Sequence, residues 1–350
     1  MYESYYGLTG LPFQLGPDPR FFFGSRVHQK AMAYLTYGLN QGEGFIIITG
    51  DIGAGKSTLV ANLISTLDTR KFVAAKVVST QLEADDLLRM VAAEFGIAAE
   101  DIDKAALLRR LENFLHSQHA VKRRSVLIID EAQNLTFGGL EELRMLLNFQ
   151  AGNRPLLQSF LLGQPQFRAV LARPELEQLR QRVIASYHLG PLDPEETKGY
   201  VEHRLRLVGW TGDPSFTNDA FAIIYRNTDG VPRRINALCS RLLLYGYLEE
   251  THVIDGPVVD QVASDMVDEI AQVTAPPPPN AVPAGGPRRA VPRRTVRSRP
   301  QELAPAEPDS AVITDLDDRV RALENHIKSH ERSIRQTRQI LAEYLERQKG

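Results

Sequence analysis

Short apolar runs alternate with amphipathic stretches along most of the chain. Five of these runs predict strands, over Phe45–Thr49, Phe72–Val78, Ser125–Ile129, Leu156–Leu162 and Val183–Leu189. Between them, apolar residues at helical spacing predict helices over Ser57–Leu67, Ala84–Phe95, Ala105–His116 and Leu140–Phe149. Strands that alternate with helices are typical of a parallel sheet covered on both faces. The pattern therefore predicts an α/β fold.

The pattern changes after Pro191, beyond which no further strand is predicted. Helical periodicity continues over four stretches, Pro194–Val208, Asn218–Asn227, Pro232–Leu248 and Pro257–Ile270. Proline stands at the start of three of these stretches, where its fixed φ suits the first turn of a helix. We therefore expect a small helical domain after the α/β domain.

The C-terminal part has two further patterns. A stretch rich in Pro, Ala and Arg opens at Ala275, so we interpret residues 273–310 as a linker, either a solvated spacer or a contact with nucleic acid or lipid headgroups. Over residues 311–350, apolar side chains recur every seven positions, at Ile313, Val320, Ile327, Ile334 and Leu341. This heptad predicts a coiled coil, for which a parallel dimer is favoured and a lone helix docking on a partner is the alternative.

Composition restricts the classes of protein that fit. The 350 residues carry a formal net charge of −2, and residues 275–350 are net basic whereas residues 1–274 are net acidic. Cys239 is the single cysteine, so neither an intrachain disulfide framework nor a Cys-based zinc site fits. The sequence has no apolar run of transmembrane length and no signal peptide at its start, so we expect a cytoplasmic protein.

A glycine-rich loop follows the first predicted strand. It matches the pattern G-x-x-x-x-G-K-[ST] with Gly50, Asp51, Ile52, Gly53, Ala54, Gly55, Lys56, Ser57 and Thr58. Glycines let the backbone wrap a phosphate, and the helix that follows adds the positive end of its dipole. Lys56 can reach the β- and γ-phosphates, and the hydroxyl of Ser57 can bind Mg²⁺. The loop therefore predicts ATP and Mg²⁺ as ligands.

An acidic pair ends the third predicted strand, where Asp130 and Glu131 follow four apolar residues. Ligands of open α/β sheets bind at this end of the strands. Asp130 can hold Mg²⁺ and Glu131 can polarise the water that attacks the nucleotide. The loop and the acidic pair alone also fit a kinase that transfers phosphate to a small molecule.

Three further features favour an ATPase over a kinase. Gln164 follows the fourth predicted strand, where its amide can orient water or contact the γ-phosphate. Arg182 precedes the fifth predicted strand and can be presented to a neighbouring subunit's nucleotide as an arginine finger, with Arg180 as the second choice. Arg233 follows Pro232 in the first turn of a helix, from which it can reach back to the phosphates.

Together these motifs resemble the AAA+ ATPases of the general-secretion protein A type. The resemblance also uses Pro12-Phe13, Pro17-Asp18-Pro19, Ala132-Gln133 and Gly230–Asn236, and it is nearest to the subgroup found at exosortase and exopolysaccharide loci. It implies a P-loop at Gly50–Ser57, a Walker B pair at Asp130 and Glu131, sensor 1 at Gln164, an arginine finger at Arg182 and sensor 2 at Arg233. It also implies that the segment around Phe13 lies near the adenine.

The resemblance implies a domain plan and a function. The expected parts are an N-terminal segment packed on the ATPase core (1–40), an AAA+ α/β domain (41–191), a helical lid (192–272), the linker and the coiled coil. The expected function is ATP hydrolysis that assembles or regulates an envelope secretion or exopolysaccharide export system. We also expect a homo-oligomer, with a ring formed through the AAA+ domain, partner proteins of that system and, through them, a peripheral position at the inner membrane.

Two other functions remain open from the sequence. The chain could be a DNA-handling AAA+ ATPase such as a transposition regulator, although only the linker arginines favour nucleic acid. It could also be a slow nucleotide switch in which the heptads carry the function.

Overall fold

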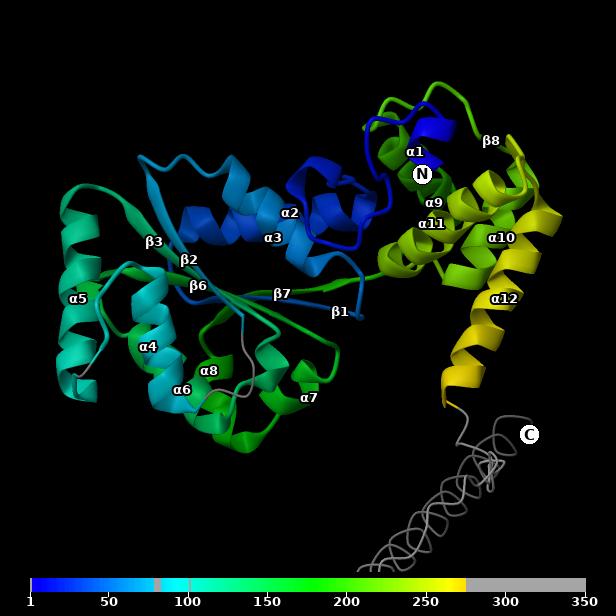
Figure 1. Cartoon of the computed structure of the whole chain (residues 1–350). Coiled ribbons are helices and arrows are strands. Elements are labelled where there is room, and N and C mark those ends of the chain that lie inside the picture. The colour runs from blue at the N-terminus through cyan, green and yellow to red at the C-terminus, as the bar shows by residue number, and fades with distance from the viewer. Residues whose placement is uncertain (1, 79–82, 101, 275–350) are drawn as a thin grey trace, which may run out of the picture. The chain divides into compact units, whose positions relative to one another are not determined.

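The five predicted strands form one parallel sheet in the computed structural model, which describes residues 2–78, 83–100 and 102–274 (Figure 1). The strands are β1 (Phe45–Gly50), β2 (Phe72–Val78), β3 (Arg124–Asp130), β6 (Leu157–Gly163) and β7 (Val183–Leu189). Their order in the sheet is β2-β3-β6-β1-β7. Because β6 lies between β3 and β1, the segments that follow these three strands meet at one edge of the sheet.

Alternating side chains of the strands divide the core into two layers. Ile46 and Ile48 pack with the helices on one face, and Phe45 and Ile47 pack with those on the other. The first face is covered by α2 (Arg26–Gln41) and α3 (Lys56–Thr66), and the second by α4 (Ala84–Glu94), α5 (Lys104–Ala120) and α6 (Phe137–Leu146) (Figure 1). Each large apolar side chain buried in these layers stabilises the fold by about 1.5–3 kcal/mol.

Shorter elements complete the α/β part. The hairpin strands β4 (Gln150–Ala151) and β5 (Arg154–Pro155) precede β6. The helices α7 (Phe167–Leu171) and α8 (Glu177–Arg180) lie between β6 and β7, and the 3-10 turns are η1 (Pro19–Phe21), η2 (Ala132–Asn134) and η3 (Pro174–Leu176).

The four predicted helices of the second part are present as α9 (Pro194–Arg206), α10 (Asn218–Thr228), α11 (Pro232–Leu248) and α12 (Gly256–Thr274). Asp193 begins α9 with a capping box, in which its carboxylate accepts from the backbone of Glu196 and the Glu196 side chain accepts in return. The structure adds a short parallel pair that the sequence did not predict, β8 (Ser215–Phe216) and β9 (Val253–Ile254). Two residues are too few to show an alternating pattern. We call these four helices and this pair the lid.

The N-terminal segment, predicted to pack on the ATPase core, contacts both the α/β part and the lid. Helix α2 does lie on the sheet, but the residues before it, including α1 (Tyr2–Tyr5), bury their apolar side chains in the lid. The buried ones are Tyr2, Tyr6, Leu8, Phe13 and Phe21. These side chains form one apolar cluster with the lid helices, which removes them from water.

The predicted linker, apart from its first two residues, and the predicted coiled coil lie outside the described residues. Within the described ranges, no helix combines the length and the apolar character needed to cross a membrane.

Candidate functional site

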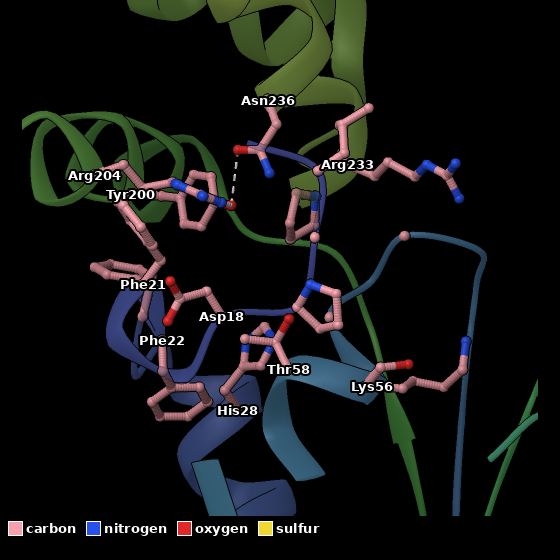
Figure 2. Close-up of a pocket in the computed structure, with 18 of the residues that line it drawn as sticks. Asp18, Phe21, Phe22, His28, Lys56, Thr58, Tyr200, Arg204, Arg233 and Asn236 are labelled. Atoms are coloured by element: carbon pink, nitrogen blue, oxygen red, sulfur yellow. Dashed lines mark hydrogen bonds between the residues drawn. The ribbon is translucent and has the colours of Figure 1, made fainter. Parts of the chain in front are cut away.

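A cavity of about 270 Å³ lies between the carboxyl edge of the sheet and the lid (Figure 2). Three parts of the chain provide most of its lining, which His28 of α2 and Glu131 after β3 complete. The N-terminal segment provides Leu15–Asp18 and Phe21–Phe23, the glycine-rich loop provides Ile52 to Thr58 with the exception of Ala54, and the lid provides Tyr200, Arg204, Pro232, Arg233 and Asn236. The glycine-rich loop, which is the strongest motif in the sequence, therefore forms part of the cavity wall. The lid closes the cavity on one side.

The glycine-rich loop has the backbone shape that an anion site requires. Gly53 and Gly55 have φ values of +84° and +96°, which L side chains rarely adopt. Helix α3 starts directly after Gly55, and no described side chain caps its first turn. Its free N–H groups and the positive end of its dipole therefore face the cavity, which suits a phosphate group.

Lys56 is folded back into the loop. Its side chain is only 5% exposed, and its Nζ donates to the carbonyl oxygens of Gly50, at 2.7 Å, and Asp51, at 3.0 Å. Burial lowers the pKa of this amine, while the nearby carboxylates of Glu131, Asp130 and Asp51 act in the opposite direction. Two neutral acceptors satisfy the ammonium group only in part, so phosphate oxygens would bind it more strongly.

A histidine that was not predicted from the sequence contacts the backbone of the loop. His28 at the start of α2 is buried, with its Nε2 3.1 Å from the carbonyl oxygen of Ala54 and its Nδ1 2.7 Å from the hydroxyl of Ser25. Burial lowers the pKa of His28, which favours the neutral ring. A Cβ on Gly55 would lie 2.7 Å from Nε2, so the glycine is needed for this contact as well as for its φ.

The acidic pair meets the loop as predicted. The hydroxyl of Ser57 donates to Oδ2 of Asp130 at 2.8 Å, and Nζ of Lys76 lies 3.4 Å from the same oxygen. Asp130 is only 3% exposed. A hydroxyl and a carboxylate are oxygen ligands of the kind that Mg²⁺ prefers, together with water and substrate phosphates. The residues present therefore fit the predicted Mg²⁺ site.

Glu131 is held by two glutamines. Its backbone is left-handed, with φ at 56°, a conformation that a non-glycine residue keeps only where its surroundings fix it. The Nε2 atoms of Gln133 and Gln164 donate to Oε2 of Glu131 at 2.5 and 3.3 Å, and the backbone N–H of Gln164 donates to Oε1 of Gln133 at 2.9 Å. The structure thus brings Gln164 to the acidic pair and adds Gln133, which lies within the quoted motif but had been given no role.

The arginines fall into two groups. The backbone N–H of Arg233 donates to the carbonyl oxygen of Gly53 at 3.2 Å, and its side chain lines the cavity and points away from Phe21 and Phe22 (Figure 2). Arg182 lies immediately before β7, at the amino ends of the strands and so on the far side of the sheet from the cavity. It donates to the backbone oxygen of Leu147 at 3.3 Å and to Asn148 at 2.6 Å.

Arg180 also lies away from the cavity, where it pairs with Glu177 and donates to the backbone oxygen of Leu171 at 3.2 Å. The cavity therefore receives Arg233 from its own chain, but neither Arg180 nor Arg182.

Comparison with known proteins agrees with this geometry. Residues 39–171 match the family model described as an AAA domain. The chain is 37% identical over 255 residues to the general secretion pathway protein A of Aeromonas hydrophila, an alignment that covers 73% of this chain. Residues 39–171 are therefore an AAA domain, and the chain has the AAA+ fold. The alignment covers 46% of the secretion protein, so this chain spans about half the length of that relative.

Solved structures show the same AAA+ fold. The ORC2 protein of Aeropyrum pernix, solved in ADPNP and ADP complexes, has a TM-score of 0.57 at 16% identity, covering 73% of this chain and 71% of that one. The Cdc6p of Pyrobaculum aerophilum has a TM-score of 0.55 at 15% identity, covering 78% of this chain and 74% of that one. At this level of identity the likeness concerns the fold alone.

The aromatic side chains at the cavity of this AAA+ protein differ from the one predicted. Phe13 is 3% exposed and packs in the core of the lid, so it is not among the lining residues of the cavity. The lining aromatics are instead Phe21–Phe23 and Tyr200. The segment therefore reaches the cavity through Leu15–Asp18, whereas the side chain of Phe13 packs among the lid helices.

Arg204 fixes this segment to the lid of the AAA+ protein. Its buried guanidinium donates to the backbone oxygens of Pro12 at 2.6 Å and Gln14 at 3.2 Å, and to Oη of Tyr200 at 2.8 Å. Tyr200 in turn donates to Asn236 at 2.9 Å (Figure 2). The guanidinium of Arg204 also lies 4.5 Å from the ring centre of Phe21, which adds a cation–π contact. One arginine thus positions the aromatic wall of the cavity.

Gly53→Ala is expected to weaken nucleotide binding and to loosen the contact between loop and lid. A Cβ at this position would lie 2.3 Å from Cβ of Arg233, and the left-handed backbone alone costs a non-glycine residue roughly 1–2 kcal/mol. Calorimetric titration with ATP measures the affinity. Gly190→Ala is the matched control, because an added Cβ there meets nothing within 4 Å. Equal affinity of both variants would contradict the proposed fit of loop and lid.

Proposed function

We propose that this AAA+ protein binds ATP with Mg²⁺ and hydrolyses it, and that this cycle assembles or regulates an envelope secretion or exopolysaccharide export system. The observation that carries the proposal is the convergence of unlike groups on one cavity. The uncapped start of α3, the buried amine of Lys56, the acidic pair and Arg233 of the lid all meet there. A structural role alone would not require a buried cation and two carboxylates beside an open helix N-terminus.

Each residue has a role that its position suits. Lys56 exchanges its two carbonyl partners for phosphate oxygens, and Ser57 with Asp130 holds Mg²⁺, which when bound supplies charge neutralisation to the phosphates. Glu131 accepts the proton of the attacking water. Gln133 and Gln164 hold the Glu131 carboxylate in place, so both amides also determine where that water can sit.

The lid gives the nucleotide a way to change the shape of the protein. Arg233 touches the loop through its own backbone N–H at Gly53, and its side chain can pair with phosphate oxygens. When the γ-phosphate is lost, the guanidinium loses a partner while the backbone contact remains. We infer that the angle of the lid follows the state of the nucleotide, which is what an assembly ATPase needs.

The secretion part of the proposal is supported by the secretion relative, at 37% identity over 73% of this chain. The exopolysaccharide alternative is supported by the combination of motifs quoted from the sequence. The likeness to origin-recognition proteins concerns the fold alone, so it does not favour the DNA-handling alternative.

Affinity capture from the native host tests the proposal as a whole. A Glu131→Gln variant held with Mg·ATP is used as bait, and Lys56→Ala without nucleotide is the control. Enrichment of export or polysaccharide components on the first bait alone supports the proposal. Enrichment of DNA that is lost at high salt supports the DNA-handling alternative instead. ATP turnover that stays slow when each captured partner is added would favour the alternative of a slow nucleotide switch.

Arg182→Ala is expected to keep ATP binding and to lower hydrolysis by about a thousandfold or more, the usual contribution of an arginine finger. Arg182 lies at the edge of the sheet opposite its own loop, so it can act only on a neighbouring subunit. Mixing provides the decisive measurement. Arg182→Ala and Lys56→Ala subunits, each inactive, regain activity together if the finger acts between subunits. Absence of recovery in verified mixed assemblies would exclude that role.

A further inference from the structure

A second cavity of about 580 Å³ lies at the amino edge of the sheet, opposite the glycine-rich loop. It is lined by residues at the starts of three strands, Phe72 of β2, Arg124 of β3 and Leu156 just before β6, and by Gly42 after α2. The motifs of the AAA+ family do not reach this edge, and the proposed ATPase cycle uses none of these residues.

Positive charge is concentrated in this cavity without compensation. Its lining contains His119, Lys122, Arg123, Arg124 and Arg154, and no acidic residue. Within the described part of the chain, none of these five forms an ion pair with an aspartate or a glutamate. Cationic side chains that converge on a concave surface attract an anion.

Part of this charge has a structural use. Arg124 donates to the backbone oxygens of Leu39 at 2.6 Å and Asn40 at 3.1 Å, which caps the last turn of α2. Arg123 donates to the backbone oxygen of Phe72 through Nη2, at 3.4 Å. The side chains of Lys122 and Arg154 have no such partner among the described residues, so they are available to a ligand.

Polar side chains in the wall of the cavity are buried and incompletely paired. Gln158 and Ser125 both line the cavity and are each 2% exposed. The amide nitrogen of Gln158 donates to the carbonyl oxygen of Gly44 at 3.0 Å, but its Oε1 has no partner among the described groups, and neither has Oγ of Ser125 or Nε of Arg123. These three atoms are closed to solvent, so they lie behind the surface of the cavity and are not open to a ligand in it. What the cavity offers to a ligand is therefore its charged side chains.

We propose that this cavity binds a small phosphate ester, either a sugar phosphate or a nucleotide. Lys122 and Arg154 bind the phosphate. Phe72 and Leu156 provide apolar surface for the ring of the sugar or base. A duplex or an extended acidic protein surface fits less well, because the free cations Lys122 and Arg154 line a cavity.

Calorimetric titration of the full chain tests the site with pyrophosphate, glucose 6-phosphate and GMP as probes. We expect binding of the phosphate esters, with glucose 6-phosphate and GMP separating the sugar and nucleotide sources. Arg154→Glu is expected to weaken it by about tenfold or more, because a charged partner of the phosphate becomes a like charge. Arg109→Glu, an exposed position on α5 outside the cavity, makes the same change of charge and is expected to have little effect.

Arg154→Ala separates a ligand site from a structural role. The Arg154 side chain has no partner among the described residues, so its removal should not lower thermal stability, while the affinity for glucose 6-phosphate or GMP should fall several-fold. The proposal is overturned if neither ester binds at millimolar concentration, or if the Glu substitutions at residues 154 and 109 weaken binding equally. It is also overturned if only DNA or an acidic peptide binds in a manner that depends on Arg154.

Discussion

Lys56→Ala is expected to abolish ATP binding. The substitution removes the buried amine that the loop now satisfies with the carbonyls of Gly50 and Asp51. Charge-assisted hydrogen bonds contribute about 1.5–3 kcal/mol each, so losing two phosphate contacts should lower the affinity by at least about a hundredfold. Calorimetric titration with Mg·ATP measures the loss directly.

The control for this substitution is Lys71→Ala. Lys71 is exposed and lies away from the cavity, so its replacement changes the net charge equally without touching the loop. Thermal unfolding of both variants distinguishes lost binding from lost folding. Tight binding of ATP by a folded Lys56→Ala protein would remove the glycine-rich loop from nucleotide recognition.

Glu131→Gln is expected to lower ATP turnover by about 10²–10⁴-fold with little change in ATP affinity. The amide keeps the size of the side chain but can no longer accept a proton from water. In the unsubstituted protein the amides of Gln133 and Gln164 donate to the Glu131 carboxylate. The substitution replaces one accepting oxygen of that carboxylate with an N–H donor. Turnover is measured by phosphate release at saturating ATP.

Glu43→Gln is the matched control, since Glu43 is exposed and outside the cavity. The affinity for ATP must be measured for both variants, because a loss of binding would also lower turnover. A Glu131→Gln protein that hydrolyses ATP at the unchanged rate would show that another group activates the water.

The strands could be predicted closely because each is a run of apolar residues bounded by polar ones. The predicted Phe72–Val78 and Val183–Leu189 coincide with β2 and β7. The order of the strands in the sheet could not be derived in this way, since it depends on which apolar faces meet after folding. The same holds for Tyr2, Tyr6 and Phe13, whose spacing has no period and whose apolar partners come together only once the lid has formed.

The candidate site shows a similar division. The loop and the acidic pair are recognisable because their residues are adjacent in sequence and their chemistry depends on that spacing. His28 and Arg204 could not be found, because their partners Ala54 and Pro12 lie 26 and 192 residues away. A lone histidine in a helix, or an arginine among charged neighbours, gives no local sign of such a contact.

The attachment of the N-terminal segment to the lid has a mechanical consequence. The backbone passes between lid and sheet twice, once before α2 and once before α9. Both crossings meet at Arg26, whose backbone N–H donates to Glu196 at 2.7 Å and whose guanidinium pairs with Asp193. Because the two links lie side by side, any movement of the lid against the sheet must turn about the line through them. Lid motion is thereby reduced to a swing about this hinge, and every swing changes the width of the same cavity.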